Sequence, residues 1–451
     1  MDLTNKTVVV AGAGKSGINA SKLLLSRNAK VILFDEKTKA TKEELHAKID
    51  NHENATIMIG ALDESVLTDV AFMVISPGIP VDAAFTNAFR EKNIPIWSEI
   101  ELAYRLSGGE IAAITGTNGK TTTTTLVGEI MKAWKDSVFV VGNIGIPYTE
   151  VTNDIKDDSI VVAEISSFQL ETIHEFAPKV SAVLNVTPDH LDRHYTFENY
   201  ADTKMKITMN QTKSETCILN YDDPVTRKMG EQIPAKPVYF SRKEMLDEGV
   251  CIVDDTIVVK EQSSEIAVLK LADVKLLGAH NVENYMAAIG IAYYMGVPVS
   301  IIENACKAFG GVEHRIEYVR TVNGVDYYND SKGTNPDAAI KAVEAMVKPT
   351  VLIGGGYDKQ STYDEWIEAF GDKVRALVLI GATAEKIAMT AKTHGFTNYV
   401  FADDLEAAVK KCAELACDGD AVLLSPACAS WDMFKSYEQR GELFKSYVNA
   451  L

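Results

Sequence analysis

A glycine-rich loop, Gly116-Thr-Asn-Gly-Lys-Thr-Thr122, constrains the fold of this chain more than any other segment. The apolar run 111–115 before the loop predicts a buried strand, and residues 123–134 after it predict a helix. Glycines let backbone N–H groups approach phosphate oxygens, and the N-terminus of a helix adds partial positive charge. The order of strand, loop and helix therefore predicts a phosphate-binding loop in an α/β domain.

The loop is shorter than the usual phosphate-binding motif, because Ile114 stands where that motif has its first glycine. Its lysine and its first threonine are in place. Lys120 can reach the terminal phosphates of a nucleotide, and the Thr121 hydroxyl can bind Mg²⁺. By itself the loop indicates nucleotide binding, with a purely structural turn as the alternative.

Length and charge limit the classes of protein that this chain can belong to. A chain of 451 residues predicts about three domains at roughly 150 residues each. A net charge of −18 argues against a nucleic-acid partner, and no apolar run approaches the ~20 residues of a membrane span. The first residues lack the order of a signal peptide, and the six scattered cysteines indicate reduced thiols. We therefore expect a cytoplasmic, monomeric protein without membrane insertion.

The first domain opens with a second glycine-rich loop. Strand 7–11 leads into Gly12-Ala-Gly-Lys-Ser-Gly17, and a later strand, 31–34, ends at Asp35. This is the G-x-G-x-x-G pattern with an acidic residue about twenty positions on, which is typical of Rossmann-like dinucleotide-binding domains. Taken alone, it predicts an NAD-dependent dehydrogenase. The further strands expected here are 71–76 and 94–97.

The second domain alternates buried apolar runs with helical patterns, which indicates a mostly parallel sheet. The expected strands are 111–115, 138–141, 160–164, 180–186 and 217–220. Residues 236–277 differ, because their apolar runs are short and separated by turns. We expect a small antiparallel appendage there, with strands 238–240, 250–253, 257–260 and 266–271. A helix over 281–295 closes the domain.

A third α/β domain follows, with expected strands 325–328, 351–353, 376–380 and 421–424. Thr334 or Asn335 is expected to cap a helix that begins near Pro336. The expected fold class is thus α/β in three domains. The first is Rossmann-like, the second is P-loop ATPase-like with the antiparallel appendage, and the third is again Rossmann-like. Their expected bounds are 1–98, 99–311 and 312–451.

Chemically active side chains follow three strands of the second domain. Lys120 and Thr121 come after one strand, Glu164 ends another, and His190 follows a third. Since the carboxyl ends of parallel strands meet at one edge of a sheet, we expect these residues to face one crevice. A carboxylate together with phosphate oxygens is the usual ligand set of Mg²⁺. A lone glutamate or histidine is often structural, but three strand ends with such residues indicate a catalytic site.

Taken together, the motifs of this chain resemble those of the Mur ligase family. No single motif is specific, but the combination is, and it runs in order along the whole chain. The stretches that carry the resemblance are Gly116–Thr121, Glu164–Glu171, Asn185–Asp192, His280-Asn281 with Asn284, His314-Arg315, Asn329–Lys332 and Ala427–Asp432.

The resemblance implies an ATP-dependent reaction that joins an amino acid to a UDP-linked muramoyl carboxylate in peptidoglycan precursor synthesis. The carboxylate takes the γ-phosphate and becomes an acyl phosphate, which the incoming amine attacks. The motifs are most similar to those of members that add D-glutamate. The implied substrates are therefore UDP-N-acetylmuramoyl-L-alanine, D-glutamate and ATP, with two Mg²⁺ ions. The Asp-Asn-Pro-Arg signature of members that add diaminopimelate or lysine is absent.

The same resemblance implies roles for individual residues. Lys120 holds the phosphates, Thr121 and Glu164 bind one Mg²⁺, and His190 lies at the second ion near the acyl group. Lys204 matches a carbamylated lysine of the family, whose carbamate would offer a metal an anionic oxygen, and the lysine two positions on is the register alternative. The implied ATP contacts are Gly116, Thr117, Asn118, Gly119, Lys120, Thr121, Thr122, Asn281, Asn284, Arg315 and Asp330. The last two lie on the third domain, which would have to close on the second.

The first glycine-rich loop then receives the UDP of the substrate instead of NAD. The implied UDP-substrate contacts are Gly14, Lys15, Ser16, Gly17, Ser76, Gly78 and Asn143. D-glutamate carries two carboxylates, so its pocket should offer cations and hydroxyl groups. The implied contacts are Thr334, Lys359, Ser430 and Tyr437. Trp431 either walls this pocket or fills core.

Three alternatives stay open at this point. A Mur ligase for a different amino acid would keep the mechanism. An NAD-dependent dehydrogenase would rest on the first loop alone and would leave two domains without a role. A nucleotide-binding module without catalysis would need Lys120 but not Glu164, His190 or Lys204.

Overall fold

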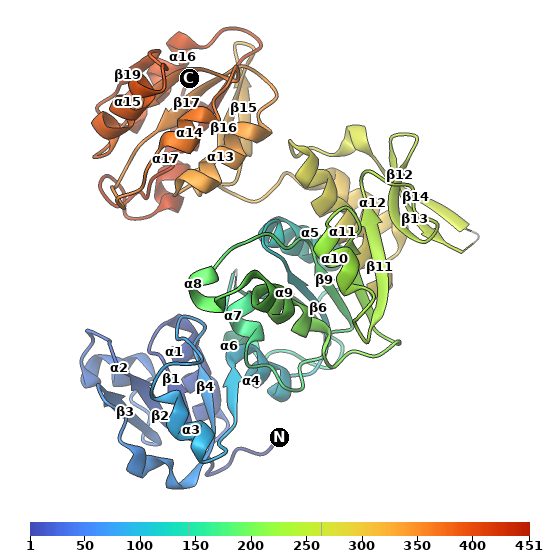
Figure 1. The fold of residues 1–451 in the computed structure, drawn as a ribbon, viewed down its shortest axis with the longest axis vertical. Helices are drawn as coiled ribbons and strands as arrows, with labels where there is room; N and C mark the ends of the chain where they lie inside the picture. Colours follow the sequence, from blue (N-terminus) through green and yellow to red (C-terminus); the bar gives the residue numbers. More distant parts are fainter. Residues whose placement is uncertain (144, 263) are drawn as a thin grey trace. The chain divides into compact units, whose positions relative to one another are not determined.

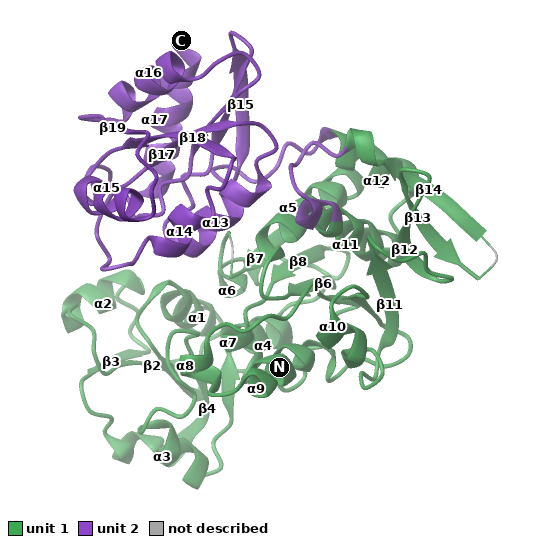
Figure 2. Cartoon of the chain, turned by 45° about the horizontal axis from the view of Figure 1, so that its top comes forward, with its two compact units in different colours: residues 1–273, 283–307 green, residues 274–282, 308–451 purple. Residues whose placement is uncertain are grey.

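Three β-sheets organise the chain in the computed structural model, which describes residues 1–143, 145–262 and 264–451 (Figure 1). Residues 1–273 with 283–307 form one compact unit, and residues 274–282 with 308–451 form a second (Figure 2). The expected three-part α/β architecture is confirmed, while the borders at 98 and 311 stay predictions. Among the described residues, no helix is long and apolar enough to cross a membrane.

The first sheet is parallel, with the strand order β3-β2-β1-β4-β5. Alternate residues of its central strand pack on opposite faces: Val8 and Val10 share a core with helix α1, and Val9 shares another with Phe89 of α3. Both faces are therefore covered, as in doubly wound folds. The elements are β1 (Thr7–Ala11), α1 (Lys15–Ser26), β2 (Lys30–Asp35), α2 (Lys42–Lys48), β3 (Ala55–Ile59), β4 (Val70–Ile75), α3 (Thr86–Glu91) and β5 (Ile96–Ser98).

The second sheet has the order β14-β13-β12-β11-β10-β9-β6-β8-β7. Its strands are β6 (Glu110–Thr115), β7 (Val138–Gly142), β8 (Ile160–Glu164), β9 (Val180–Val183), β10 (Thr216–Asn220), β11 (Lys236–Ser241), β12 (Gly249–Val253), β13 (Thr256–Glu261) and β14 (Ser264–Lys270). The expected antiparallel pairing is confirmed for β12, β13 and β14. Strand β11 differs from the expectation, because it pairs in parallel with both β10 and β12. The appendage thus extends the main sheet.

Helices α4 to α12 belong to the same part of the chain. The ones that matter for the site are α5, which follows the glycine-rich loop, and the short α7 and α8, which follow β8 and β9. Their bounds are α4 (Glu99–Leu106), α5 (Lys120–Trp134), α6 (Tyr148–Val151), α7 (Ser167–Leu170), α8 (Leu191–His194), α9 (Phe197–Met205), α10 (Pro224–Met229), α11 (Ala279–Met295) and α12 (Val299–Ala308).

The third sheet has the order β15-β16-β20-β17-β18-β19, with only β15 antiparallel to its neighbour. As expected, Asn335 caps the helix after β16, where its side chain accepts from the Ala338 N–H at 2.9 Å. The elements are β15 (Glu317–Val322), β16 (Val325–Asn329), α13 (Pro336–Ala345), β17 (Thr350–Gly354), α14 (Asp364–Glu368), β18 (Val374–Leu379), α15 (Ala384–Thr393), β19 (Tyr399–Phe401), α16 (Leu405–Leu415), β20 (Ala421–Leu424) and α17 (Tyr437–Asn449).

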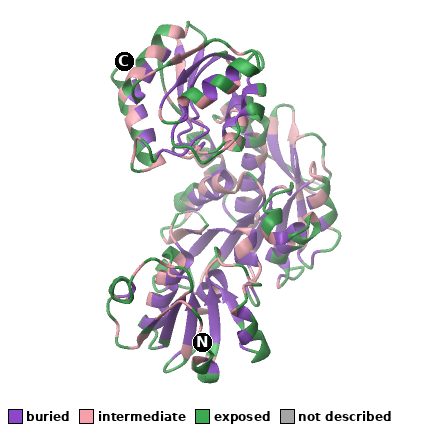
Figure 3. Ribbon diagram, turned by 60° about the vertical axis from the view of Figure 1, so that its left-hand side comes forward, coloured by how far each residue is buried: buried purple, intermediate pink, exposed green. Residues whose placement is uncertain are grey.

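Burial follows the sheets, since the central strands are buried along their length and exposure is confined mainly to the helices and loops (Figure 3). Three edge strands, β3, β15 and β19, escaped sequence analysis. Most of their residues are only partly buried or are exposed, whereas the central strands are buried along their length.

A core substitution in the third sheet tests this packing. Leu423 of β20 is fully buried between β16 and β17, so Leu423→Ala should destabilise the second unit by about 2–5 kcal/mol through lost burial and a residual cavity. Thermal unfolding followed by calorimetry would show one transition shifted downward. The control is Val347→Ala at a site that is 75% exposed, where a comparable shift would contradict the packing argument.

Candidate active site

The loop before α5 keeps its glycines for steric reasons. Gly119 has φ +84°, and a Cβ at this position would lie 2.3 Å from Asn284 Oδ1. Gly119 is the N-cap of α5 and has no side chain with which to cap the helix. The first N–H groups of the helix are therefore not claimed by a capping side chain and can serve an anion.

The loop is held in shape by the segment that follows β9. The Asn118 N–H donates to Asn185 Oδ1 at 2.8 Å, and Asn185 Nδ2 donates back to the Asn118 carbonyl at 3.1 Å. Thr117 Oγ1 donates to the Thr187 carbonyl at 3.2 Å. Sequence analysis assigned no role to Asn185, although it stands inside the motif 185–192. These bonds fix the loop before any ligand arrives, which reduces the entropy cost of binding.

Two lysines meet at one carbonyl of this loop. Lys120 Nζ donates to the carbonyls of Gly116 at 2.8 Å and Thr117 at 2.9 Å. Lys204 Nζ, from α9, donates to the same Gly116 oxygen at 2.9 Å. Lys204 is 1% exposed, and burial, followed by repulsion from Lys120, lowers its pKa to about 6. Lys206, the register alternative, is exposed and instead donates to the Glu171 carbonyl at 3.2 Å.

Glu164 ends β8 and has one oxygen available. Its Oε1 accepts from Asn143 Nδ2 at 2.8 Å. Its Oε2 is buried and has no hydrogen-bond partner among the described residues. A buried carboxylate oxygen without a partner is costly unless a ligand satisfies it. The adjoining Gly142 has φ +106°, and a Cβ there would lie 2.2 Å from the Glu164 carbonyl oxygen, so the two strand ends approach closely.

His190 lies farther from its strand than the sequence suggested. Strand β9 ends at Val183, and His190 is reached through a loop that leads into α8. The residue has φ +51° and a half-exposed side chain whose Nε2 is 3.6 Å from Asp189 Oδ2. Its ring lies 4.9 Å from that of Phe168 on α7, between centroids. The loop, and not the end of the strand, sets its position.

The first glycine-rich loop is equally constrained. Gly12 has φ +100°, and a Cβ at Gly17 would lie 1.8 Å from the Gly12 carbonyl oxygen. Asp35 turns back onto the loop, where its Oδ2 accepts from the Ala13 N–H at 2.8 Å, and its Oδ1 accepts from the Lys37 N–H at 3.0 Å. Gly14 caps α1 without a side chain. The acidic residue of the fingerprint thus stabilises its own loop.

The other residues expected at the UDP substrate lie around this loop. Ser76 Oγ donates to the Gly12 carbonyl at 3.5 Å, and Lys15 Nζ donates to the Gly145 carbonyl at 3.5 Å. Ser16 is partly buried in the first turn of α1, and Gly78 has open space around it. Asn143 directly follows β7 of the second sheet and donates from Nδ2 to Glu164 Oε1.

Asp330 and Ser430 are the buried polar groups of the second unit that sequence analysis expected at ligands. Asp330 Oδ2 accepts from Ser425 Oγ at 2.7 Å and Oδ1 accepts from the Ile316 N–H at 3.3 Å, while burial raises its pKa to about 7. Among the described residues, Ser430 Oγ is buried without a hydrogen-bond partner. As with Glu164, an unsatisfied buried group indicates a place for a ligand.

The remaining expected residues of this unit are more exposed. Arg315 and Lys359 are exposed, and Thr334 is partly buried before α13. Lys359 Nζ lies 5.1 Å from the centroid of the Trp431 ring, which is 63% exposed, so Trp431 does not fill core. The remaining expected residue, Tyr437, begins α17, and burial raises its hydroxyl pKa to about 12.

Asn281 and Asn284 were expected to face one ligand, but their side chains form hydrogen bonds with different parts of the protein. Asn281 Nδ2 donates to the Leu277 carbonyl at 2.7 Å, and Leu277 packs against the core of the second unit. Asn284 Oδ1 accepts from Thr123 Oγ1 at 3.4 Å, beside the phosphate loop. Both lie on α11, which passes from one compact unit to the other.

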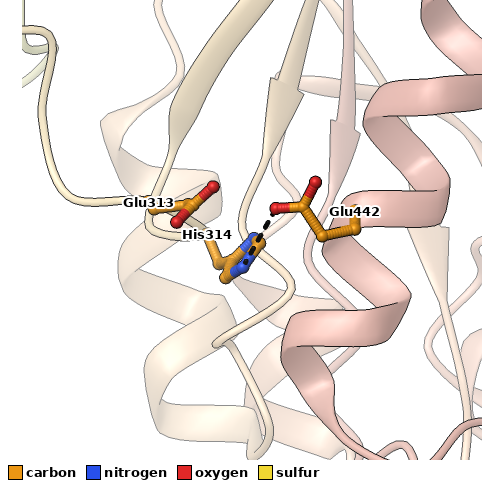
Figure 4. A group of neighbouring side chains, drawn as sticks. All are labelled: Glu313, His314 and Glu442. Atoms are coloured by element: carbon orange, nitrogen blue, oxygen red, sulfur yellow. Dashed lines mark ion pairs between the residues drawn. The ribbon is translucent and has the colours of Figure 1, made fainter.

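A second cluster of ionisable groups was not expected from the sequence. Glu313, His314 and Glu442 present ligand atoms within 4.8 Å of one another (Figure 4). Lys445 lies among them, with Nζ 2.5 Å from Glu313 and 2.9 Å from Glu442. The ammonium group balances the carboxylates, so we interpret the cluster as an ion-pair network that ties α17 to the start of β15.

Three family models match the chain. The Mur ligase MurD-like N-terminal domain matches residues 6–98, the Mur ligase middle domain matches 114–292, and the Mur ligase glutamate ligase domain matches 314–428. Curated relatives called UDP-N-acetylmuramoylalanine–D-glutamate ligase align over the whole chain. The relative from Lachnoclostridium phytofermentans is 53% identical over 451 residues, covering 100% of this chain and 99% of the relative. The Thermoanaerobacter relative is 48% identical and the Clostridioides difficile relative 44%, each covering 100% of both chains.

Solved structures share the fold at lower identity. MurC from Thermotoga maritima, a UDP-N-acetylmuramate–alanine ligase, superposes with a TM-score of 0.58 at 17% identity, covering 99% of both chains. MurF from Acinetobacter baumannii gives a TM-score of 0.61 at 15% identity, covering 97% of this chain and 93% of its own.

A loop substitution tests the steric argument. Gly119→Ala should weaken ATP binding at least about tenfold, because a left-handed alanine costs about 1–3 kcal/mol and its Cβ would collide with Asn284. Isothermal titration calorimetry with a non-hydrolysable ATP analogue measures the change. Gly310→Ala is the control, since a Cβ there meets no atom within 4 Å. Unaltered affinity in Gly119→Ala would refute the requirement for glycine.

Proposed function

This chain belongs to the Mur ligase family, and we propose that it adds D-glutamate to UDP-N-acetylmuramoyl-L-alanine, with ATP, in peptidoglycan precursor synthesis. The observation that carries the proposal is the full-length identity of 53% to a relative called UDP-N-acetylmuramoylalanine–D-glutamate ligase. The three family models along the chain support it, because each belongs to the same family.

The reaction proceeds in two steps. The carboxylate of the muramoyl substrate attacks the γ-phosphorus of ATP, so that ADP leaves and an acyl phosphate forms. The amine of D-glutamate attacks the acyl carbon, phosphate leaves, and the amine loses a proton as the amide forms. Such phosphoryl transfer depends mainly on positioning and on charge neutralisation. Lys120, with the N–H groups of the Gly116–Thr122 loop, supplies both at the phosphates.

The donors near the loop fit Mg²⁺. Glu164 Oε2 offers a buried carboxylate oxygen that no described residue claims, and Thr121 offers a hydroxyl beside the phosphate loop. We assign one ion to Thr121 and Glu164, and a second to His190 and a carbamylated Lys204. Bound Mg²⁺ would neutralise charge on the phosphates. His190 lies on the loop between β9 and α8.

Lys204 has the protonation state that carbamylation requires. With a pKa lowered to about 6, its amine is largely uncharged at neutral pH. An uncharged amine adds to the carbon of CO₂ and releases a proton, giving a carbamate. The modification would place an anion beside the Lys120 ammonium group, so the two side chains would attract each other.

The remaining residues are assigned to the other substrates. Around the first loop, the UDP substrate would meet Gly14, Lys15, Ser16, Gly17, Ser76, Gly78 and Asn143. Beside the second unit's Trp431, Lys359 would pair with a carboxylate of D-glutamate. Ser430, with an unsatisfied buried hydroxyl, and Thr334 would donate hydrogen bonds, and Tyr437 would pack against the substrate.

The reaction is tested by phosphate release from ATP with UDP-N-acetylmuramoyl-L-alanine. We expect release with D-glutamate and none with L-glutamate, L-alanine, L-lysine or diaminopimelate, with a product heavier by one glutamyl residue in mass spectrometry. Release with a different amino acid would overturn the assigned specificity. Absence of release with every amino acid would overturn the ligase assignment.

Replacing Lys204 tests the carbamate. Lys204→Ala should lower kcat by about 100-fold or more, since the metal site loses an anionic ligand. Acetate or formate at millimolar concentration should restore part of the activity by supplying the missing oxygen. Lys206→Ala is the matched control and should keep wild-type kcat. Full activity of Lys204→Ala without any added carboxylate would remove Lys204 from the metal site.

A further inference from the structure

The segment that carries His190 adopts a conformation that its own sequence does not favour. Helix α8 is only Leu191–His194, and the residues on both sides of it are left-handed, with φ +51° at His190 and +67° at Tyr195. Such values are uncommon for residues with a Cβ and persist only where the surroundings impose them. The contacts of this segment therefore decide where the His190 ring lies.

Arg193 makes the strongest of these contacts. Its Nε donates to Glu171 Oε1 at 3.1 Å and its Nη2 donates to Glu171 Oε2 at 2.5 Å, a bidentate pair with side chains only 11% and 9% exposed. Nη2 also donates to the Ile79 carbonyl at 2.8 Å. Ile79 directly follows Ser76-Pro-Gly78, the loop assigned above to the UDP substrate. One guanidinium thus connects that loop to the end of the Glu164–Glu171 motif.

The Phe168 ring lies between the same guanidinium and the His190 ring. The guanidinium carbon lies 4.7 Å from the centroid of the Phe168 ring, and the Phe168 ring lies 4.9 Å from the His190 ring. Phe168 belongs to α7, which starts three residues after Glu164. Arg193, Phe168 and His190 therefore contact one another in series, with the guanidinium over the Phe168 ring and the His190 ring against that ring in a T-shaped arrangement, so the position of the guanidinium bears on that of the imidazole.

Two neighbours strengthen the connection. The Tyr195 hydroxyl donates to Asp82 Oδ2, a second bond from this segment to the loops after β4. His194 lies on the same segment, with Nε2 3.0 Å from Ser167 Oγ and Nδ1 3.8 Å from Glu171 Oε1, farther from that carboxylate than the donating nitrogens of Arg193. Arg193 is thus the principal charge partner of a largely buried carboxylate.

We propose that Arg193 is a positioning residue that sets the place of the His190 ring and couples it to the loop that receives the UDP substrate. The proposal rests on the function proposed above. Arg193 touches no reacting atom and acts through Phe168 and His190. Seating of the substrate against Ser76–Ile79 is transmitted to the imidazole near the acyl group, so a substrate without its UDP end loses kcat as well as affinity.

A double-mutant cycle tests the coupling. Arg193→Gln should lower kcat about tenfold while the KM for ATP changes less than about twofold. A tenfold loss of kcat corresponds to a free energy within the range measured for coupling between contacting residues. In a His190→Gln background the same substitution should have less than about a twofold effect, because the residue through which it acts is gone. Arg193→Lys keeps the positive charge but cannot form the bidentate pair with Glu171, so its kcat should lie between those of wild type and Arg193→Gln.

Arg105 is the matched control. It too pairs with a buried glutamate, Glu101, at 2.6 Å, and it lies over the Trp97 ring at 4.3 Å. Among the described residues, no hydrogen bond or ion pair joins its side chain to the segment 186–196. Arg105→Gln should lower the unfolding temperature as Arg193→Gln does, but keep wild-type kcat. If both variants lose stability and kcat in the same proportion, Arg193 is merely structural.

A second readout does not depend on turnover. With labelled histidine, the His190 ring resonance, identified by its loss in His190→Gln, should shift in Arg193→Gln and stay in place in Arg105→Gln. Equal kcat losses from Arg193→Gln in the wild-type and His190→Gln backgrounds, or an unmoved resonance, would overturn the proposal. The wild-type protein distinguishes the two hypotheses. If it releases no phosphate, the proposed function is wrong, and the resonance measurement still tests the positioning role of Arg193.

Discussion

The carbonyl oxygen of Gly116 accepts hydrogen bonds from two lysine side chains at once, and much of the candidate site is arranged around that point. Lys120 comes from the first turn of α5, and Lys204 comes from α9, 84 positions farther along the chain. Two ammonium groups that share one acceptor oxygen repel each other, and burial of Lys204 makes its charged form still less favourable. The conflict can be relieved by deprotonation of Lys204, by its carbamylation, or by arrival of an anion.

The rigid parts and the adjustable parts of the site have different origins. The phosphate loop is fixed by Gly119, where a Cβ would lie 2.3 Å from Asn284 Oδ1, and by the paired bonds between Asn118 and Asn185. His190, by contrast, stands on a short segment whose conformation is imposed by neighbours from two sheets. A rigid anion cradle beside a positioned imidazole suits a reaction in which phosphate is held still while an acyl group forms and is consumed.

Much of this arrangement was predictable. Continuous apolar runs between helical patterns predicted the central strands, because a strand buried on both faces must be apolar throughout. The spacing of the glycines indicated both glycine-rich loops. Edge strands β3, β15 and β19 were missed because most of their residues are only partly buried or are exposed, so they lack the long buried apolar run of a central strand. The position of β11 was misjudged because the pairing direction of a short strand depends on its neighbours, and the sequence of the strand itself does not encode it. The stack of Arg193 on Phe168 had no local signal at all.

The sequence by itself determined the three α/β sheets, the two glycine-rich loops and the resemblance to the Mur ligases. These follow from sterics and from hydrophobic periodicity over a few residues at a time. Only the tertiary structure decided that Lys204, and not Lys206, donates to the phosphate loop. It also decided that Glu164 and Ser430 each have a buried oxygen without a hydrogen-bond partner among the described residues. Finally, it decided that Asp35 accepts a hydrogen bond from the first glycine-rich loop. Those features depend on which segments, far apart in the chain, are brought within 3 or 4 Å of one another. Burial and charge then act on them together, as the lowered pKa of Lys204 illustrates.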